Sequence, residues 1–340
     1  MRKLLNVLYV TTPESYLSKD GDNVVVCVKQ TEVFRIPAIN IEGIVMFGYM
    51  GASPGLMKLC ADRGIALTFC SPHGHYIGRF QGPVQGNVLL RKRQYKVAED
   101  FGYCLELSKI FIAGKVQNYR NILMRNLRDY GPNPDIEAAV ARHSVLKGSI
   151  LNAIDPDELR GYEGDAANVY FGVFQQLMTS QRQEFVFSGR NRRPPKDPVN
   201  ALLSFVYTLI AHECAAALES VGLDPYVGFL HTTRPGRTSL ALDLMEEMRA
   251  YLGDRLVLSL INRKQVSPSD FKYQGEQGVV MSDAARRTVI TAWQNRKKEL
   301  FIHPFLNEKI PIGLLPYIQA KLLAKYIRQD LDAYPVFLIK

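Results

Sequence analysis

Cysteine is scarce in this chain of 340 residues, and its five copies follow no regular spacing. No CxxC pair occurs, which argues against a zinc ribbon and against a thioredoxin-like redox motif. Cys60 and Cys70 with His73 and His75 make a poor zinc site, because the two cysteines are far apart and lie in apolar runs. The pattern favours reduced thiols in a cytoplasmic protein.

A hydrophobic run long enough to cross a membrane is also missing. The longest uncharged apolar run, residues 198–211, is shorter than the ~20 residues that a span needs, so a buried core helix is predicted there. The N-terminal residues MRKLLNVLYVTT lack a small-residue cleavage site and are more typical of a strand than of a signal peptide. We therefore expect a soluble cytoplasmic protein without a membrane partner.

The common nucleotide and hydrolase motifs are absent: no P-loop, no GxGxxG after a strand and no GxSxG. Nucleotide hydrolysis and dinucleotide chemistry thus have no support. The charge balance, in contrast, is informative. Forty-two Lys and Arg face 33 Asp and Glu, which gives a net charge of +9 and a pI near 9.2. Such an excess favours a polyanionic partner, most simply nucleic acid, although a basic protein without one has the same balance.

The chain is long enough for two domains, and its patterning changes near residue 84. Residues 1–84 are rich in short Val and Ile runs separated by turn residues, which predicts a β-rich domain with one short helix. From residue 85 to 340, helical periodicity dominates. The fold class predicted is α+β multidomain, with an N-terminal β-rich domain followed by an all-α catalytic domain.

Particular elements follow from these patterns. We expect a hairpin over residues 271–280 and a core helix over residues 200–220, with Asp197 as its N-cap. The strands are expected at residues 4–11, 24–28, 33–37, 41–47, 65–70 and 76–80, and the short helix at 54–61. The other helices are expected at residues 88–107, 110–128, 136–151, 159–178, from 240 onward, 282–300 and 314–331.

One acidic stretch, residues 228–249, has the sequence GFLHTTRPGRTSLALDLMEEMR. Ser239 is the expected N-cap of a helix whose apolar face points inward, while Asp243, Glu246 and Glu247 lie on the opposite arc. Their mutual repulsion, roughly 0.2–0.5 kcal/mol per pair, would be removed by a divalent cation. His231 ends an apolar run before the turn at residues 234–237 and can converge on these acids. A merely solvated acidic face is the alternative.

A second acidic position lies inside an apolar pattern at residues 159–178. Glu163 falls in the middle of a stripe at three-and-four spacing, where a carboxylate is costly unless it is paired, protonated or bound to a metal. Gly161 and Gly164 flank it and leave room for a phosphate or another backbone. The alternatives are a buried ion pair with an arginine and a metal ligand that faces a cleft.

A basic loop is expected at residues 188–196, because prolines and a glycine interrupt any helix there. Its cations suit contacts to DNA phosphates, although an exposed linker has the same composition. The turn at residues 234–237 adds two more arginines. The residues expected to contact DNA are Arg190, Arg192, Arg193, Lys196, Arg234 and Arg237.

Glu163, His231, Asp243 and Glu246 together form the predicted catalytic set. Carboxylate oxygens with one imidazole suit Mg²⁺ or Mn²⁺, which keep coordination positions open for substrate oxygens. A divalent ion can polarise a phosphodiester, and a basic surround can hold the polyanion. The residues alone therefore predict phosphodiester transfer or hydrolysis.

Three separated motifs occur in an order that resembles a known family. They are LRGYEG at 159–164, RRPP at 192–195 followed by DPVNALLS at 197–204, and GFLH at 228–231 followed by SLALDLME at 239–246. The chain resembles, over nearly its whole length, the CRISPR-associated integrases of spacer acquisition, the first-numbered Cas proteins, of a type I-like kind. The resemblance implies metal ligation by Glu163, His231 and Glu246, with Asp243 close to the metal. Some members have Asp where this chain has Glu246.

The resemblance also implies partners. A homodimer of this chain would join the second-numbered Cas protein in a heterohexamer that holds double-stranded prespacer DNA. A prespacer 3′-OH would attack the CRISPR repeat, without a covalent protein–DNA intermediate. Two alternatives stay open: a stand-alone metal-dependent nuclease acting on branched DNA or RNA, and a non-catalytic DNA-binding scaffold.

Overall fold

The structure is a computed structural model that describes residues 6–71, 76–80, 82, 88–191 and 194–339. The chain forms two compact units. The smaller unit contains residues 1–85 together with 283–298, and the larger unit contains residues 86–282 and 299–340. Helix α9 (Asp283–Lys298), which the sequence pattern assigned to the second domain, is thus grouped with the smaller unit. The confirmed fold class is a β-rich N-terminal part followed by a mostly helical part.

The N-terminal part of the smaller unit contains two sheets and helix α1 (Pro54–Arg63). In the first sheet, β1 pairs parallel with β5, β5 pairs parallel with β6, and β6 pairs antiparallel with β7. The second sheet is an antiparallel meander in the order β2-β3-β4. The strands are β1 (Val7–Val10), β2 (Ser15–Asp20), β3 (Asn23–Val28), β4 (Thr31–Pro37), β5 (Gly43–Phe47), β6 (Ala66–Cys70) and β7 (Tyr76–Phe80). Strand β2 escaped the sequence patterning because most of its residues are polar.

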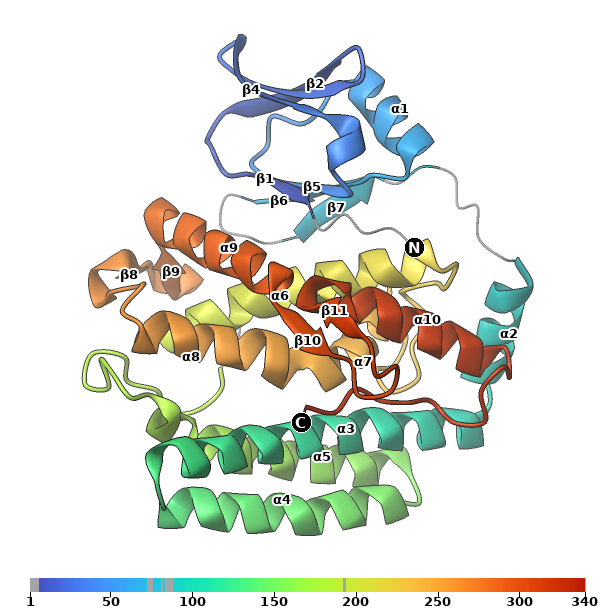
Figure 1. Ribbon diagram of the computed structural model, residues 1–340, viewed down its shortest axis with the longest axis vertical. Coiled ribbons are helices and arrows are strands. Elements are labelled where there is room, and N and C mark those ends of the chain that lie inside the picture. Colours follow the sequence, from blue (N-terminus) through green and yellow to red (C-terminus); the bar gives the residue numbers. More distant parts are fainter. Residues whose placement is uncertain (1–5, 72–75, 81, 83–87, 192–193, 340) are drawn as a thin grey trace. The chain divides into compact units, whose positions relative to one another are not determined.

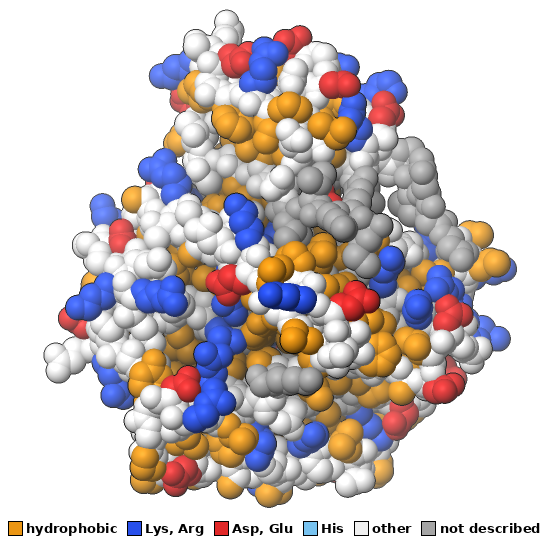
Figure 2. Space-filling model, in the orientation of Figure 1, with side chains coloured by type: hydrophobic (Ala, Val, Ile, Leu, Met, Phe, Trp, Pro, Cys, Tyr) orange, Lys and Arg blue, Asp and Glu red, His pale blue; other side chains and the backbone are white. Residues whose placement is uncertain are grey.

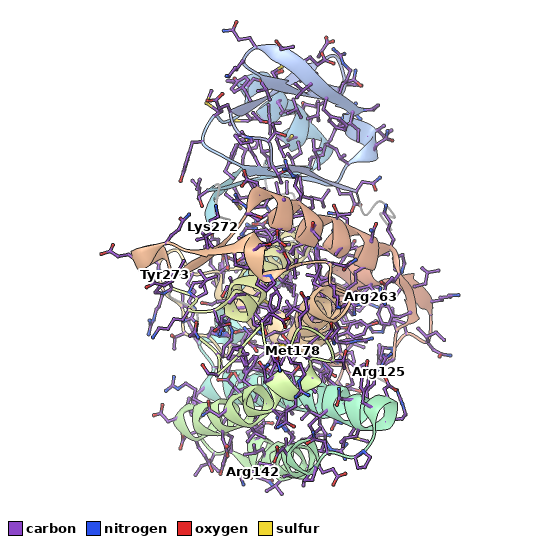
Figure 3. All side chains as sticks on the ribbon, turned by 90° about the vertical axis from the view of Figure 1, so that its left-hand side faces the viewer. Arg125, Arg142, Met178, Arg263, Lys272 and Tyr273 are labelled. Carbon is purple, nitrogen blue, oxygen red and sulfur yellow. The ribbon has the colours of Figure 1, made fainter. Side chains whose placement is uncertain are left out.

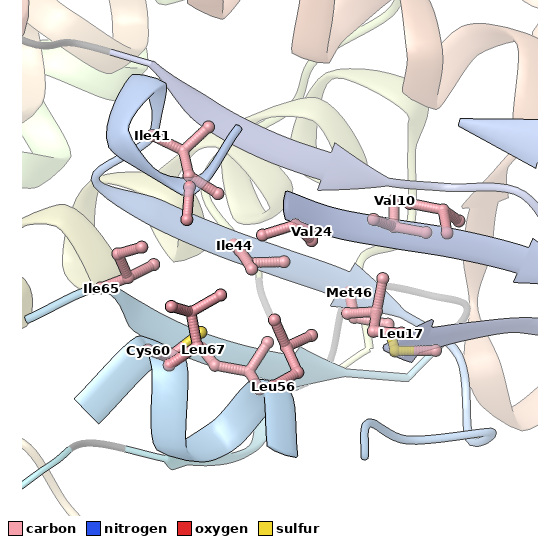
Figure 4. Packing of buried hydrophobic residues seen from close by; sticks show 13 residues of the cluster. Val10, Leu17, Val24, Ile41, Ile44, Met46, Leu56, Cys60, Ile65 and Leu67 are labelled. Atoms are coloured by element: carbon pink, nitrogen blue, oxygen red, sulfur yellow. The ribbon is translucent and has the colours of Figure 1, made fainter. Parts of the chain in front are cut away.

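The core of the smaller unit lies between these sheets and α1 (Figure 4). Leu17 from β2, Ile44 from β5 and Leu67 from β6 have no exposed surface. Helix α1 covers them with Leu56 and begins where the Ser53 side chain accepts a hydrogen bond from the Leu56 amide at 3.2 Å. The β-rich prediction is therefore confirmed in its main elements.

The larger unit is mostly helical and also contains two small antiparallel sheets, so the expected all-α domain is not wholly helical. The hairpin predicted at residues 271–280 is confirmed as β8 (Phe271–Tyr273) and β9 (Val279–Met281). The other sheet pairs β10 (Leu300–Ile302) with β11 (Lys309–Pro311). The helices are α2 (Val88–Ala98), α3 (Phe101–Tyr130), α4 (Pro134–Asn152), α5 (Pro156–Gly172), α6 (Pro198–Ser220), α7 (Ser239–Met248), α8 (Arg255–Asn262) and α10 (Leu315–Ile327).

The predicted break near residue 108 is wrong, and the break lies at Asp100 instead. The Asp100 side chain accepts a hydrogen bond from the Tyr103 amide at 2.9 Å, so it caps the 30-residue helix α3. The apolar periodicity continues through this cap, which is why the pattern alone did not reveal it. Similarly, the helix expected to reach Met178 ends at Gly172 and is followed by a short 3₁₀ turn.

Helices α3, α4 and α5 lie side by side (Figure 1). Their shared core includes Ile112 and Val116 from α3, Ile150 from α4 and Ala166 from α5. Leu230, from the loop before α7, packs against this cluster. The arrangement thereby brings the loop that carries His231 and the helix that carries Glu163 to the same helix, α3.

Helix α6 is the buried centre of the larger unit. It is long and apolar enough to cross a membrane by length and composition, but 67% of its most apolar stretch is buried inside the protein. It packs against α7 and α10, as expected of a core helix. Its predicted cap is confirmed, because the Asp197 side chain accepts a hydrogen bond from the Asn200 amide at 2.8 Å.

Candidate active site

The acidic arc of α7 is not a solvated face. Asp243 and Glu247 have no exposed surface, and Glu246 is 3% exposed. Three buried carboxylates are costly unless each is paired, so their partners reveal their roles. The expected Ser239 cap is also wrong. Thr238 is the N-cap without a side-chain bond, and the Ser239 hydroxyl donates to the Thr232 carbonyl at 3.2 Å.

Asp243 fixes His231 and the backbone around it. Its Oδ2 accepts hydrogen bonds from the amides of Phe229 at 2.7 Å and Leu230 at 3.1 Å. Its Oδ1 contacts the His231 amide at 2.9 Å and the His231 Nδ1 at 2.7 Å. A carboxylate on Nδ1 favours the tautomer with a proton there, which leaves Nε2 as the free lone pair. Asp243 is therefore an orienting residue whose oxygens are already occupied.

Gly228 is what allows the loop to approach α7 so closely. A Cβ built on Gly228 would lie 2.8 Å from both the Asp243 Oδ2 and the Ser239 Cβ. No larger residue fits this position without moving α7 or the loop. The glycine in the GFLH motif thus has a packing reason that is linked directly to the orientation of His231.

Glu246 lies between two buried cations. Its Oε1 is 2.8 Å from the guanidinium of Arg249, and its Oε2 is 2.9 Å from the Nζ of Lys115. Burial would raise the pKa of Glu246, but Arg249, Lys115 and His231 together lower it, so the carboxylate stays ionised. Lys115 also donates a side-chain hydrogen bond to Glu246, so both oxygens of this buried carboxylate contact a cation.

Glu163 reaches the same ammonium from α5. Its Oε1 is paired with Lys115 Nζ, and its side chain is 35% exposed. The alternative of a buried ion pair with an arginine therefore differs from the structure in two ways, because the cation is a lysine and Glu163 itself is half-buried. Two residues further along α5, Asp165 turns away and pairs with Arg142 of α4, whose position Figure 3 labels. Of these two acids, only Glu163 contacts the lysine that is also paired with Glu246 of α7.

Lys115 and Arg249 are functional candidates that the sequence reasoning did not select. The side chain of Lys115 is only 1% exposed. Burial alone would lower the pKa of Lys115, but nearby carboxylates, with Glu246 foremost, raise it. A signal was available, because Ile112, Val116 and Tyr119 surround Lys115 at helical spacing on a buried stripe. Glu163 was selected by the same kind of pattern.

The donor set fits a hard divalent ion. Glu246 offers a buried carboxylate, His231 offers Nε2, and Glu163 supplies a second carboxylate at the same ammonium. As they stand, no three acidic, imidazole or thiol side chains within the described residues are grouped closely enough to hold an ion. The ammonium of Lys115 contacts both carboxylates.

Contacts to the Tyr207 side chain connect the basic loop, residues 188–196, to this site. The guanidinium carbons of Arg249 and Arg190 lie 4.8 Å and 5.4 Å from the centroid of the Tyr207 ring. The Tyr207 hydroxyl donates to the buried Asp254. Arg190 also donates to Asn200 Oδ1 at 2.7 Å and to Ser204 Oγ at 3.1 Å. The guanidinium of Arg190 is thus engaged inside the protein, and its contact with DNA stays a prediction.

The remaining cations expected to contact DNA differ in exposure. Lys196 and Arg234 are exposed, whereas Arg237 is half-buried. The amide of Arg237 donates to the Arg234 carbonyl at 3.0 Å and so closes the turn. Arg192 and Arg193 lie outside the described residues. Figure 2 shows that Lys and Arg side chains are spread over the visible face and are interspersed with fewer Asp and Glu. Such a surface suits a polyanion.

Glu247 lies on the same helix, α7, as Asp243 and Glu246, but it has different partners. It accepts hydrogen bonds from the Tyr334 hydroxyl, the Phe337 amide and the Gln319 side chain. Burial raises its pKa to about 7. Glu247 thus anchors the C-terminal segment, residues 334–339, to α7.

Asn118 connects the same C-terminal segment to α3. Its Nδ2 donates to the carbonyls of Glu247 at 2.7 Å and Phe337 at 2.9 Å, and its Oδ1 accepts from the Ile339 amide at 2.8 Å. Gly114, four residues earlier, has no room for a Cβ because Val336 lies against it. The C-terminal segment therefore fixes α3, which carries Lys115, against α7, which carries Glu246.

Replacing Asn118 by alanine is expected to lower the free energy of unfolding of the larger unit by about 2–3 kcal/mol, because buried backbone groups lose their partners. Chemical denaturation followed by circular dichroism at 222 nm measures this change. Asn152→Ala is the matched control, since Asn152 makes one exposed bond to the Gly148 carbonyl at 3.0 Å. Equal midpoints for the two variants would show that Asn118 does not hold the two helices together.

Comparisons with known proteins point to one family. The profile of the family described as CRISPR associated protein Cas1 matches residues 8–295. The chain is 50% identical over 340 residues to CRISPR-associated endonuclease Cas1 1 of Chlorobaculum tepidum, with 99% of both chains covered.

Two solved structures share the fold at low identity. A casposase bound to integration product has a TM-score of 0.84 and 22% identity, with 97% of this chain and 94% of that chain covered. A Cas6-RT-Cas1–Cas2 complex has a TM-score of 0.83 and 22% identity, with 98% of this chain and 36% of that chain covered. These two likenesses show the fold alone, whereas the profile and the 50% identity show the family: the chain belongs to the Cas1 family of CRISPR-associated proteins.

Proposed function

We propose that this protein is a metal-dependent integrase that inserts double-stranded prespacer DNA into a CRISPR array. The observation that carries the proposal is that Glu163 and Glu246, from two helices, contact one buried ammonium, near a His231 that Asp243 orients. Buried acids of this kind are too costly to be incidental, which argues against a non-catalytic scaffold. The name of the Chlorobaculum relative supports a nuclease, and the likeness to a casposase bound to integration product supports integration.

The proposed cofactor is Mg²⁺ or Mn²⁺, held by Glu163, His231 Nε2 and Glu246. When bound, such an ion would polarise the phosphodiester and stabilise negative charge on the attacking and leaving oxygens. Asp243 is not proposed as a ligand, because both of its oxygens accept hydrogen bonds from the His231 loop. Its role is to present Nε2 of His231 in a fixed direction.

The chemistry proposed is a transesterification. A prespacer 3′-hydroxyl attacks a phosphorus atom of the repeat, a new P–O bond forms, and the bond to the repeat's own 3′-oxygen breaks and leaves a 3′-hydroxyl. One phosphodiester replaces another, so no nucleotide hydrolysis and no covalent protein intermediate are needed. Because this reaction consumes no nucleotide, it agrees with the absence of a P-loop from the sequence. Glu163 is one-third exposed, which leaves an approach from solvent on the α5 side of the site.

The partners proposed are a second copy of this chain and Cas2, assembled as a heterohexamer around prespacer and repeat DNA. The solved Cas6-RT-Cas1–Cas2 complex has Cas2 as the partner of that protein, and its fold matches this chain. A net charge of +9 provides the electrostatic attraction that such DNA requires.

Lys196 is proposed to contact a DNA phosphate, since its side chain is exposed on the basic loop. Lys196→Ala is expected to weaken binding to all duplex sequences equally and to reduce the slope of log affinity against log salt by about 0.9. Fluorescence anisotropy between 50 and 300 mM KCl, roughly the range where this dependence is measured, tests it. The control is Lys321→Ala, an exposed lysine on α10. An unchanged slope would remove Lys196 from the DNA contacts.

The proposed function is tested by comparing duplexes with 3′-hydroxyl and 3′-deoxy ends. Purified protein, with and without Cas2, is incubated with each duplex and a repeat-containing supercoiled plasmid in Mn²⁺, Mg²⁺ or chelator. Joined products that need both the hydroxyl and the metal support the integrase. Cleavage that is indifferent to the 3′ end supports a stand-alone nuclease on branched DNA or RNA, because water is then the attacker. Binding without chemistry in any metal supports a scaffold.

A further inference from the structure

Lys115 is the most unusual group in the candidate site. It is an ammonium with 1% of its side chain exposed, and it contacts two carboxylates from two different helices. Its Nζ is 2.9 Å from Glu246 Oε2 and is paired with Glu163 Oε1. Both of these residues are proposed metal ligands. The lysine therefore occupies the space between the oxygens that a divalent ion would bind.

An ammonium and a divalent ion compete for this carboxylate pair. In a buried site, two cations a few ångströms apart repel strongly, since little water screens them. In the structure, the lysine has both carboxylates as its partners. Binding of an ion must displace Nζ from at least one of them.

We propose that Lys115 is a built-in counter-ion that competes with the divalent metal for Glu163 and Glu246, and so keeps metal affinity low in the free protein. The proposal rests on the proposed function, since it takes these residues as metal ligands. Without metal, the ammonium prevents the two carboxylates from repelling each other. With metal, it leaves them.

The structure provides a neighbouring place for the displaced ammonium. Nζ lies 5.9 Å from the centroid of the Tyr119 ring, which stacks on Tyr170 at 3.8 Å. The face of an aromatic ring attracts a cation, so a small movement of the lysine exchanges a carboxylate contact for a ring contact. A DNA phosphate in the site adds negative charge and thereby favours loading of the metal together with the DNA.

The test is a titration of Mn²⁺ into DNA-free protein, in which the electron paramagnetic resonance signal measures the concentration of the free ion. Lys115→Met is expected to bind Mn²⁺ at least about tenfold more tightly than the wild type, because it removes the competing charge. Lys115→Gln, which keeps a hydrogen-bond donor for the carboxylates, is a second variant with the same expected direction. Lys115→Arg keeps the charge and is expected to bind no more tightly than the wild type.

Lys109→Met is the matched control, because Lys109 lies on the same helix and pairs with Glu106 at 2.7 Å, away from the site. It is expected to leave the affinity unchanged. The proposal is overturned if wild-type binding requires Glu246 but Lys115→Gln and Lys115→Met bind Mn²⁺ equally or more weakly.

Wild-type binding that Glu246→Ala does not alter would instead refute the metal site itself and, with it, the proposed function. Melting temperatures provide the second readout. Mn²⁺ should raise the melting temperature of Lys115→Gln more than that of the wild type, and an equal or smaller rise would count against the proposal.

Discussion

Replacing Glu163 by alanine is expected to reduce strand joining by on the order of a thousandfold or more, because loss of a ligand removes several kcal/mol of transition-state stabilisation. The fold is expected to survive. Glu163 is one-third exposed, and Lys115 keeps its second partner, Glu246, when Glu163 is removed. Initial rates of joining in Mn²⁺, together with the melting temperature, measure the two parts of this prediction.

Asp165→Ala is the matched control for this experiment. Asp165 lies on the same helix two residues away, but its partner is Arg142 on α4. It is expected to join DNA at nearly the wild-type rate. Joining by Glu163→Ala at the rate of the Asp165 variant would contradict the assignment of Glu163 as a metal ligand.

Asp243→Asn is expected to have two large effects at once. An amide has only one acceptor oxygen, so its NH₂ group must face either the amides of Phe229 and Leu230 or the donors of His231. Placing donor against donor in a buried site costs about 3 kcal/mol in the free energy of unfolding. Releasing His231 from its fixed tautomer is expected to lower the joining rate by a further factor of roughly 10–100.

Asp224→Asn provides the comparison in the same loop region. Asp224 accepts from the Tyr226 amide and the Tyr95 hydroxyl, both at 2.9 Å, in a half-exposed setting. Its effect on unfolding is expected to stay below about 1 kcal/mol. Chemical denaturation measures the change in the free energy of unfolding of both variants, and initial joining rates measure the change in their activity. If Asp243→Asn kept a wild-type rate, the orientation of His231 would have no part in the chemistry.

Local patterns were sufficient to predict much of the site. Glu163 stood out because its helix places it on an apolar stripe, and its carboxylate does contact a buried cation. His231 and Asp243 are twelve residues apart and separated by one turn, so their contact depends on short-range geometry. The hairpin at residues 271–281 and the Asp197 cap were predictable for the same reason.

What escaped prediction depends on contacts between distant segments. Lys115 lies 48 or more positions before Glu163 and Glu246 in the chain, and no local sequence pattern predicts its contacts with them. Glu247 was grouped with its neighbours on the helical arc, yet the C-terminal segment determines its role. Arg190 was assigned to DNA from charge alone, because the polar side chains of Asn200 and Ser204 gave no sign that they would bind it.

The central claim is that Glu163, His231 and Glu246 hold one divalent ion. A crystal grown with Mn²⁺ and measured at the manganese absorption edge tests it directly. We predict an anomalous peak within about 2.0–2.4 Å of both carboxylates and of His231 Nε2, with Lys115 Nζ withdrawn from Glu246. A peak elsewhere, or none at saturating Mn²⁺ with Lys115 still between the two glutamates, would contradict the claim.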